Sequence, residues 1–373
     1  MLYLDPFSEN DFRRLDAVRE DICVSIYMPT HLMARHGEEQ DRVKFRDLVR
    51  DLGRRLEEAG ADKRRVGTMI EHMQDLVEDE GFWRYLAKGL AVLATPETVQ
   101  TYRLPMEVPQ TVDVSDRFHL KPMIPLLAFQ RRAYVLDLTI HRAVLWEVSE
   151  GDIREVDVPG LPKTFEEAMV ARVGIDWKIY VDKNQSAHKK TYERLYCRQV
   201  EGALRNFLRG QKVPLVLAGV ETVLTYYKEV DTYGHTVPET ITGNQEHTPQ
   251  NELAERARAI VEKGFQAVIE GHLAEVNNRQ SANRGSMDIN EIARAAQEGR
   301  VERLLVNLDE PVYGTLEAGL GSFVPGAPDS PKTYDVLDEL AGLTLRNGGE
   351  ILCAHRDTLP EGVKVAATFR YAA

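Results

Sequence analysis

Cysteine is scarce in this sequence, and the few cysteines lie far apart. The chain has three, Cys23, Cys197 and Cys353, so neither a disulfide framework nor a CxxC metal pair is predicted. Such usage fits a reducing cytoplasm, where we expect the protein to be located. The 10 histidines are scattered and form no HExxH motif. We therefore predict no metal site and no other cofactor.

Long hydrophobic runs are also missing. One of the longest, Met123 to Phe129, is far shorter than the roughly 20 residues that a membrane span requires. The first residues lack a basic segment followed by an apolar one, so we expect neither export nor membrane association. Repeats and low-complexity tracts are absent. With 373 residues, 43% of them hydrophobic and 28% charged, the chain is predicted to form two or three globular domains.

Residues 1–127 predict a divergent α+β domain. Ser8 with Asp11 resembles a capping box that begins a short helix. The next segments predict a strand over 21–28, a long helix over 38–59, a second amphipathic helix around 66–77, and two strands over 89–94 and 99–104. The proline-rich stretch 104–125 is interpreted as a connector.

Residues 128–284 predict a second domain with a mixed sheet and helices. Strands over 134–140, 142–148 and 153–158 alternate with tight turns and indicate an antiparallel meander. The domain continues with a basic helix that ends near Gly210 and a buried strand over 213–219. A helix from Thr248 to about residue 275 and a polar linker over 277–285 follow.

Residues 285–373 predict a compact α/β sandwich. Asp288 with Glu291 is expected to cap a helix that ends at Gly299, and Ser330 to begin another. Strands are predicted over 301–308, 350–354 and 365–371, with a flexible loop between Leu316 and Ser330. Strands that alternate with helices favour a mostly parallel sheet.

A basic island is the strongest functional signal. The motif Lys183-Asn184-Gln185-Ser186-Ala187 runs into a helical segment that contains His188, Lys189, Lys190, Arg194 and Arg198. Residues 178–212 hold nine Lys and Arg against three acids, although the chain has a net charge of -12. A cationic island on an acidic protein favours a polyanion, since each neutralised phosphate releases counterions. A solvated helix face explains the same pattern equally well.

Other motifs have functional interpretations that compete with structural ones. Asp137 and Asp157 are candidates for the metal-binding carboxylates of an RNase H-like nuclease, but Asp137 also fits an ordinary outward-facing acid on a strand. The triplet Gly243-Asn244-Gln245 is interpreted as a turn. Three tyrosines are candidates for stacking on RNA bases, although strand tyrosines more often pack in a core: Tyr226, Tyr227 and Tyr233.

The order of these elements resembles a known family. The second domain resembles the middle domain of archaeal and eukaryotic class 1 peptide-chain release factors, because it has a meander, a loop with Asn-Gln-Ser-Ala, a basic helix and then a strand and a helix. The corresponding loop of those factors has Gly-Gly-Gln-Ser-Ala. The run 295–306, the segment 347–351 and the closing 367–371 resemble the third domain of those factors and of Pelota. The chain is therefore similar to the bacterial relatives of the archaeo-eukaryotic release factors, with a release-factor-like middle domain whose loop 182–190 replaces Gly-Gly-Gln, and a Pelota/L7Ae-like third domain.

The resemblance implies entry into the ribosomal A site, with the middle domain facing rRNA or the tRNA acceptor end. Gln185 has the position of the glutamine that orients a water against the peptidyl-tRNA ester. Asn184 tolerates a left-handed backbone better than other non-glycine residues, but Lys183 carries a Cβ where the family has glycine. RNA-directed docking in rescue, hibernation or quality control is thus favoured, and peptidyl-tRNA hydrolysis that uses Gln185 is the enzymatic alternative. A translational GTPase such as elongation factor Tu is the further partner that the resemblance implies.

Overall fold

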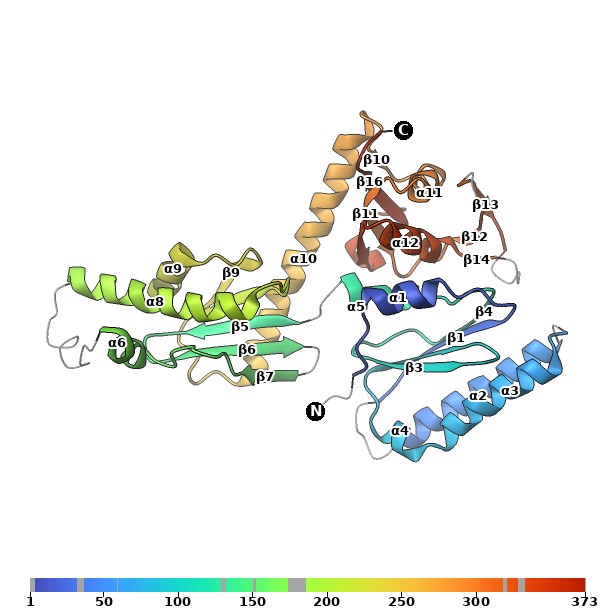
Figure 1. Ribbon diagram of the computed structural model, residues 1–373, viewed down its shortest axis with the longest axis horizontal. Helices are drawn as coiled ribbons and strands as arrows, with labels where there is room; N and C mark the ends of the chain where they lie inside the picture. Colours follow the sequence, from blue (N-terminus) through green and yellow to red (C-terminus); the bar gives the residue numbers. More distant parts are fainter. Residues whose placement is uncertain are drawn as a thin grey trace. The chain divides into compact units, whose positions relative to one another are not determined.

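A computed structural model (Figure 1) describes residues 4–31, 37–58, 60–128, 132–149, 152–173, 186–317, 321–327 and 333–372. The described helices and strands form a mixed α/β architecture with four sheets, which confirms the predicted fold class. Contacts group the chain into two compact units. Unit 1 combines Met1–Ala128 with Ile269–Ala373, and unit 2 is Phe129–Val268. The division into residues 1–127, 128–284 and 285–373 stays a prediction.

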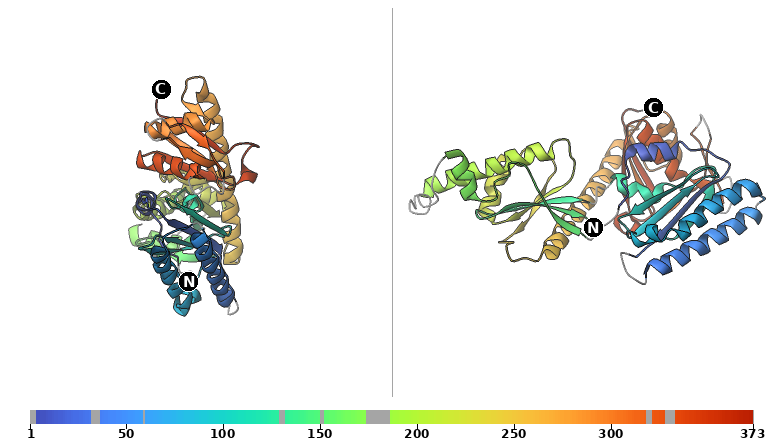
Figure 2. Two further views of the ribbon diagram at one scale, coloured as in Figure 1. Left: turned by 90° about the vertical axis from the view of Figure 1, so that its right-hand side faces the viewer. Right: turned by 60° about the horizontal axis from the view of Figure 1, so that its bottom comes forward.

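The first sheet of unit 1 is antiparallel, with the strand order β3-β2-β1-β4. Its core includes Phe45, Met69 and Met73, which are fully buried against the sheet. Figure 2 shows α2 and α3 side by side along one face. The bounds are β1 Cys23–Pro29, β2 Gly89–Ala94, β3 Val99–Leu104, β4 Thr111–Ser115, α2 Gly37–Glu58, α3 Lys63–Glu78 and α4 Glu80–Arg84.

Most elements of this segment agree with the sequence. Helix α1, Glu9–Asp16, begins with the predicted capping box, in which the Asp11 amide donates to the Ser8 hydroxyl at 3.2 Å and the Ser8 amide donates to the Asp11 carboxylate at 3.0 Å. The connector interpretation of 104–125 was wrong in part. β4 lies within it and pairs with the long strand β1, followed by the short helices η1 (Lys121–Met123) and α5 (Ile124–Ala128).

The second sheet of unit 1 has the strand order β10-β16-β11-β15. Its strands are β10 Gly285–Ser286, β11 Val301–Asn307, β15 Glu350–Ala354 and β16 Val365–Phe369, and its helices are α11 Ile289–Gln297 and α12 Val336–Arg346. β11 pairs in parallel with β15, but β16 runs antiparallel to β11 and to β10. The expected mostly parallel sheet was wrong, because the last strand returns without a crossover helix.

Part of the segment expected to be a loop between Leu316 and Ser330 forms a strand, β13, of a small sheet. This sheet has the order β13-β12-β14, with β12 Tyr313–Leu316, β13 Phe323–Pro325 and β14 Tyr334–Asp335. The following helix, α12, is capped by Asp335, whose carboxylate accepts from the Leu337 amide at 3.2 Å. Ser330, where we expected this helix to begin, lies outside the described residues. β12 and β14 therefore hold the start of α12 in place.

A layer of ion pairs joins two sequence-distant parts of unit 1. Arg117 pairs with Glu339 at 2.9 Å, His119 with Asp338 at 2.5 Å, and Lys121 with Asp335 at 2.5 Å. The three cations precede or begin η1, whereas the three acids lie at the N-terminus of α12. That arrangement also suits the helix dipole, which favours negative charge there.

His119 is the titratable member of this ion-pair layer. Burial alone would lower its pKa, but the carboxylate of Asp338, helped by Asp335 and Asp113, outweighs burial and raises the pKa to about 9. Its side chain is 16% exposed, and its ring lies edge-on to Tyr27. His119 is therefore protonated and paired at neutral pH.

Unit 2 is built on one five-stranded sheet with the order β7-β6-β5-β8-β9. The predicted meander is confirmed, since β5, β6 and β7 pair antiparallel, and the apolar run 213–219 forms the buried strand β8, which pairs in parallel with β5 and β9. The bounds are β5 Ala133–Leu138, β6 Ala143–Ser149, β7 Asp152–Val156, β8 Leu215–Gly219 and β9 Thr236–Thr242.

Helices cover both faces of this sheet (Figure 1). α6 (Phe165–Val173), α8 (Ser186–Leu208) and α9 (Glu221–Val230) pack on one face, and the first part of α10 (Gln250–Gln280) packs on the other. α10 is longer than predicted and continues into the expected linker 277–285. Ile269, Leu273 and Val276 are buried at helical spacing, which explains why the helix does not end at residue 275.

Candidate functional site

Helix α8 separates its apolar and cationic residues on two sides. Tyr196, Cys197, Val200 and Leu204 are at most 1% exposed and belong to the core beneath the helix. The other side is exposed and carries four cations, and a fifth, Arg209, directly follows the helix. We call these five residues the α8 stripe: Lys190, Arg194, Arg198, Arg205 and Arg209. At 1.5 Å per residue the stripe is about 28 Å long.

The acids of α8 compensate only part of this stripe. Glu193 and Glu201 are buried, with 6% and 4% exposure. Glu201 accepts from Arg205 at 3.0 Å and from the Thr232 hydroxyl. Burial acts to raise the pKa of Glu201, but these hydrogen bonds outweigh it and the pKa is lowered. Glu201 therefore stays ionised and anchors Arg205.

Arg194 is held from a neighbouring helix. Its guanidinium donates to both carboxylate oxygens of Glu229 on α9, at 2.8 and 3.1 Å, and lies 5.2 Å from the centre of the Tyr226 ring. A bidentate pair of this kind fixes the plane of the guanidinium. Arg194 is thus oriented, although its charge is partly compensated.

Three cations of the stripe are available to bind a partner. In the part of the chain that the structure describes, Lys190, Arg198 and Arg209 form no ion pair and are exposed. They lie near the two ends and the middle of the helix. An extended row of uncompensated cations fits a linear polyanion better than a small anion, which needs convergent donors.

The structure describes only some of the residues that were predicted to bind RNA. Lys183, Asn184 and Gln185 lie outside the described residues. His188 and Lys189 fall within the first turn of α8, but their side chains are likewise outside the description. The structure thus brings together Lys190, Arg194 and Arg198 of the predicted set and adds two cations near the end of the helix, Arg205 and Arg209. Arg205 and Arg209 follow Arg198 by seven and eleven residues, and this helical spacing could have identified both from the sequence.

Asp137 does not face solvent, so its expected outward orientation was wrong. It is 1% exposed and pairs with Arg142 at 3.2 Å. Burial raises its pKa, and Arg142 opposes that rise. Asp157 follows β7 and is exposed. Among the described residues, no group of three or more His, Cys, Asp or Glu side chains is arranged to hold a metal ion.

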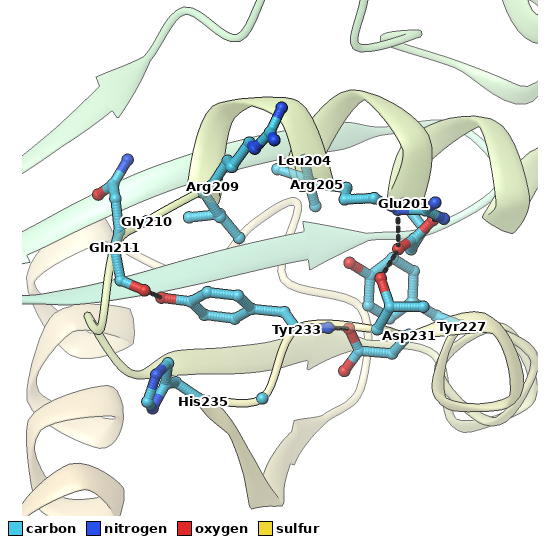
Figure 3. Close-up of a pocket in the computed structure, with 13 residues that line it drawn as sticks. Glu201, Leu204, Arg205, Arg209, Gly210, Gln211, Tyr227, Asp231, Tyr233 and His235 are labelled. Carbon is cyan, nitrogen blue, oxygen red and sulfur yellow. Dashed lines mark hydrogen bonds and ion pairs between the residues drawn. The ribbon is translucent and has the colours of Figure 1, made fainter.

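The second glutamine triplet forms part of a bend after β9. Gly243 has a φ of +113°, and the buried Gln245 side chain donates to the Gly243 carbonyl at 3.0 Å. The turn interpretation agrees with this geometry. Tyr226 and Tyr227, expected in a strand, lie on α9, where both are buried. Tyr227 and Tyr233 line a pocket at the end of α8 that sequence spacing did not indicate (Figure 3).

The middle of the chain matches a known protein family. Residues 132–300 match the model of bacterial archaeo-eukaryotic release factor family 3. This match confirms the resemblance drawn from the Asn-Gln-Ser-Ala motif and its basic helix, and it covers nearly all of unit 2. No curated protein sequence matches the chain. Of the described helices, none is long and apolar enough to cross a membrane.

Solved structures of translation factors also align with the chain. An archaeal translation termination factor, aRF1, is 11% identical over 98% of this chain and 99% of its own, with a TM-score of 0.24. Saccharomyces cerevisiae Dom34 is 10% identical over 99% and 94%, with a TM-score of 0.41. Ribosome-bound archaeal Pelota is 15% identical over 76% and 78%, with a TM-score of 0.42.

Proposed function

We propose that this protein is a ribosome-associated, release-factor-like factor that binds ribosomal RNA or the tRNA acceptor end through the α8 stripe. Its role would be rescue, hibernation or quality control of ribosomes, without efficient hydrolysis of peptidyl-tRNA. The observation that carries the proposal is the row of exposed cations on α8 in a chain of net charge -12. The family match over residues 132–300 supports a role in translation.

The positive charge of the α8 stripe would allow an acidic protein to bind RNA. An acidic protein is repelled by RNA at long range, so binding requires a local region where phosphates replace counterions. Lys190, Arg198 and Arg209 supply three unpaired charges for that exchange, and Arg194 and Arg205 supply oriented guanidinium groups. Residues 285–373 would then face a translational GTPase such as elongation factor Tu, which is the partner that the resemblance implies.

Cosedimentation with ribosomes across a salt series tests the proposal. The stripe variant reverses its three unpaired cations to Glu: Lys190, Arg198 and Arg209. The matched control reverses three exposed cations of unit 2 that lie off the stripe: Lys163, Lys228 and Arg256. Both variants change the net charge equally, so only position distinguishes them.

We expect the stripe variant to bind about tenfold or more weakly than the control, and its dependence of log affinity on log salt to fall by about two to three units. Long-range repulsion is the same in both variants. Equal cosedimentation of the two variants at low salt would contradict the assignment of this surface.

A further inference from the structure

A pocket of about 260 Å³ lies where the α8 stripe ends (Figure 3). Its walls come from the last turns of α8, the turn that follows, the end of α9 and the loop 231–235. Buried side chains of Leu204, Leu208 and Tyr227 contribute apolar surface. Arg209, the last cation of the stripe, also lines the pocket, so the stripe and the pocket are continuous.

The polar walls are fixed before any ligand arrives. The Tyr233 hydroxyl donates to the Val213 carbonyl at 2.7 Å, and the Tyr233 amide donates to Asp231 at 3.0 Å. The Tyr233 ring and the His235 ring meet edge to face, with centres 5.4 Å apart. Pre-organised side chains of this kind reduce the entropy lost on binding.

The charges in the pocket decide what kind of group fits. Glu201 and Arg205 form an ion pair and neutralise each other. The remaining charged side chains of the lining are Asp231, which is negative, and Arg209, which is positive. The C-terminal ends of α8 and α9 contribute partial negative charge from their free carbonyls. The interior therefore does not favour a free anion. A flat, uncharged group with hydrogen-bond donors and acceptors fits better, and a phosphate belongs outside, at Arg209.

We propose that this pocket receives the base of an unpaired nucleotide in the RNA whose backbone lies along the α8 stripe. This inference rests on the proposed function and names the kind of RNA that the site selects. The volume is slightly below the roughly 300–1,000 Å³ of drug-sized sites, which suits a single base. RNA recognition commonly places a splayed base against aromatic rings and guanidinium groups, and Tyr233, His235 and Arg209 supply both.

Asp231 gives the pocket a preference among bases. One of its oxygens accepts from Tyr233, and in the described part of the chain the other accepts from no side chain or amide. A carboxylate oxygen accepts from the exocyclic amino group of adenine, guanine or cytosine, whereas uracil has no such group and can donate only through its ring N3–H. We therefore expect uracil to be the weakest occupant.

The test uses the full-length protein and two RNA hairpins with the same stem. One hairpin has a single bulged 2-aminopurine, whose fluorescence reports stacking, and the other is fully paired. Stacking of one base contributes about 1–3 kcal/mol, so we expect about tenfold tighter binding of the bulged hairpin and a change in its fluorescence. A bulged uracil should bind more weakly than a bulged adenine.

Variants separate the pocket from the stripe. Asp231→Asn and His235→Ala should reduce the preference for the bulge at least threefold and leave affinity for the paired hairpin unchanged. They keep the Tyr233 hydroxyl bond to Val213, which Tyr233→Ala would remove. Arg198→Glu should weaken both hairpins equally, because that residue lies on the stripe away from the pocket.

The outcomes distinguish the two proposals. Equal affinity for both hairpins, with no change in 2-aminopurine fluorescence, would overturn the base pocket and leave the stripe intact. Failure of both hairpins to bind, together with loss of ribosome cosedimentation, would overturn the proposed function and the pocket with it. A bulge preference that survives Asp231→Asn and His235→Ala would also overturn the pocket.

Discussion

Replacing His119 with Gln should remove much of the pH dependence of unit 1 stability below pH 8. His119 contacts Asp338 at 2.5 Å, and Asp335 and Asp113 lie close enough to raise its pKa further, while Lys121 is engaged with Asp335. Gln can still donate a hydrogen bond to Asp338 but carries no charge at any pH. The variant therefore isolates the titration of one group.

The expected magnitude follows from the two pKa values of His119. The folded value is about 9, whereas an unperturbed histidine has a pKa of about 6.5. Because the folded pKa is the higher one, the stability it contributes is fully present below about pH 6.5 and is lost as the pH rises through about 9. The full contribution is at most about 3 kcal/mol, and about 2 kcal/mol of it is lost between pH 6 and pH 8.

Urea unfolding at a series of pH values measures this loss. Trp83 is the tryptophan of unit 1, so a background with Trp146→Phe and Trp177→Phe makes its fluorescence the sole reporter. The comparison should stay below pH 8, because burial raises the pKa of Cys23 to about 11 and its ionisation in the unfolded chain adds a second loss at higher pH. Parallel stability curves for the parent and His119→Gln between pH 6 and pH 8 would refute the reasoning.

Two further predictions concern unit 2. Arg142→Ala leaves the Asp137 carboxylate buried without its cation, so we expect a loss of about 3 kcal/mol in urea unfolding, partly recovered by adding Asp137→Asn; a loss below about 1 kcal/mol would contradict the pairing. In peptide release from purified ribosome complexes, the parent should release little, because Lys183 and Asn184 replace two glycines. Glycine at both positions should raise release, and Gln185→Ala should abolish the gain; strong release by the parent that depends on Gln185 would contradict a non-enzymatic role.

Local signals predicted the regular elements well. The capping box at Ser8, the meander of β5 to β7 and the buried strand β8 all follow from short-range patterns of side chains. Such patterns report which residues are buried at a fixed spacing, and that information is local. The basic face of α8 was predictable for the same reason, since Lys190, Arg194 and Arg198 recur every four residues.

Long-range pairings were harder to predict. β4 lies in a proline-rich stretch and pairs with the edge of β1, and the small sheet β13-β12-β14 joins strands that are not contiguous in the sequence. The burial of Asp137 was also hard to predict, because it depends on the ion pair with Arg142 across a turn. The pocket at the end of α8 combines residues near 205 and near 233, and nothing in their spacing connects them.

The division of unit 1 between the two ends of the chain sets an order for its synthesis and folding. Residues 129–268 form a contiguous unit with its own core, so they can fold as soon as they leave the ribosome. The first 128 residues reach that point earlier, yet Arg117, His119 and Lys121 lack their carboxylate partners until residues 335–339 have been made. Completing unit 1 thus requires closure of a loop longer than 200 residues, a slow, non-local step. The nascent N-terminal segment therefore spends most of translation without the carboxylates that pair with Arg117, His119 and Lys121.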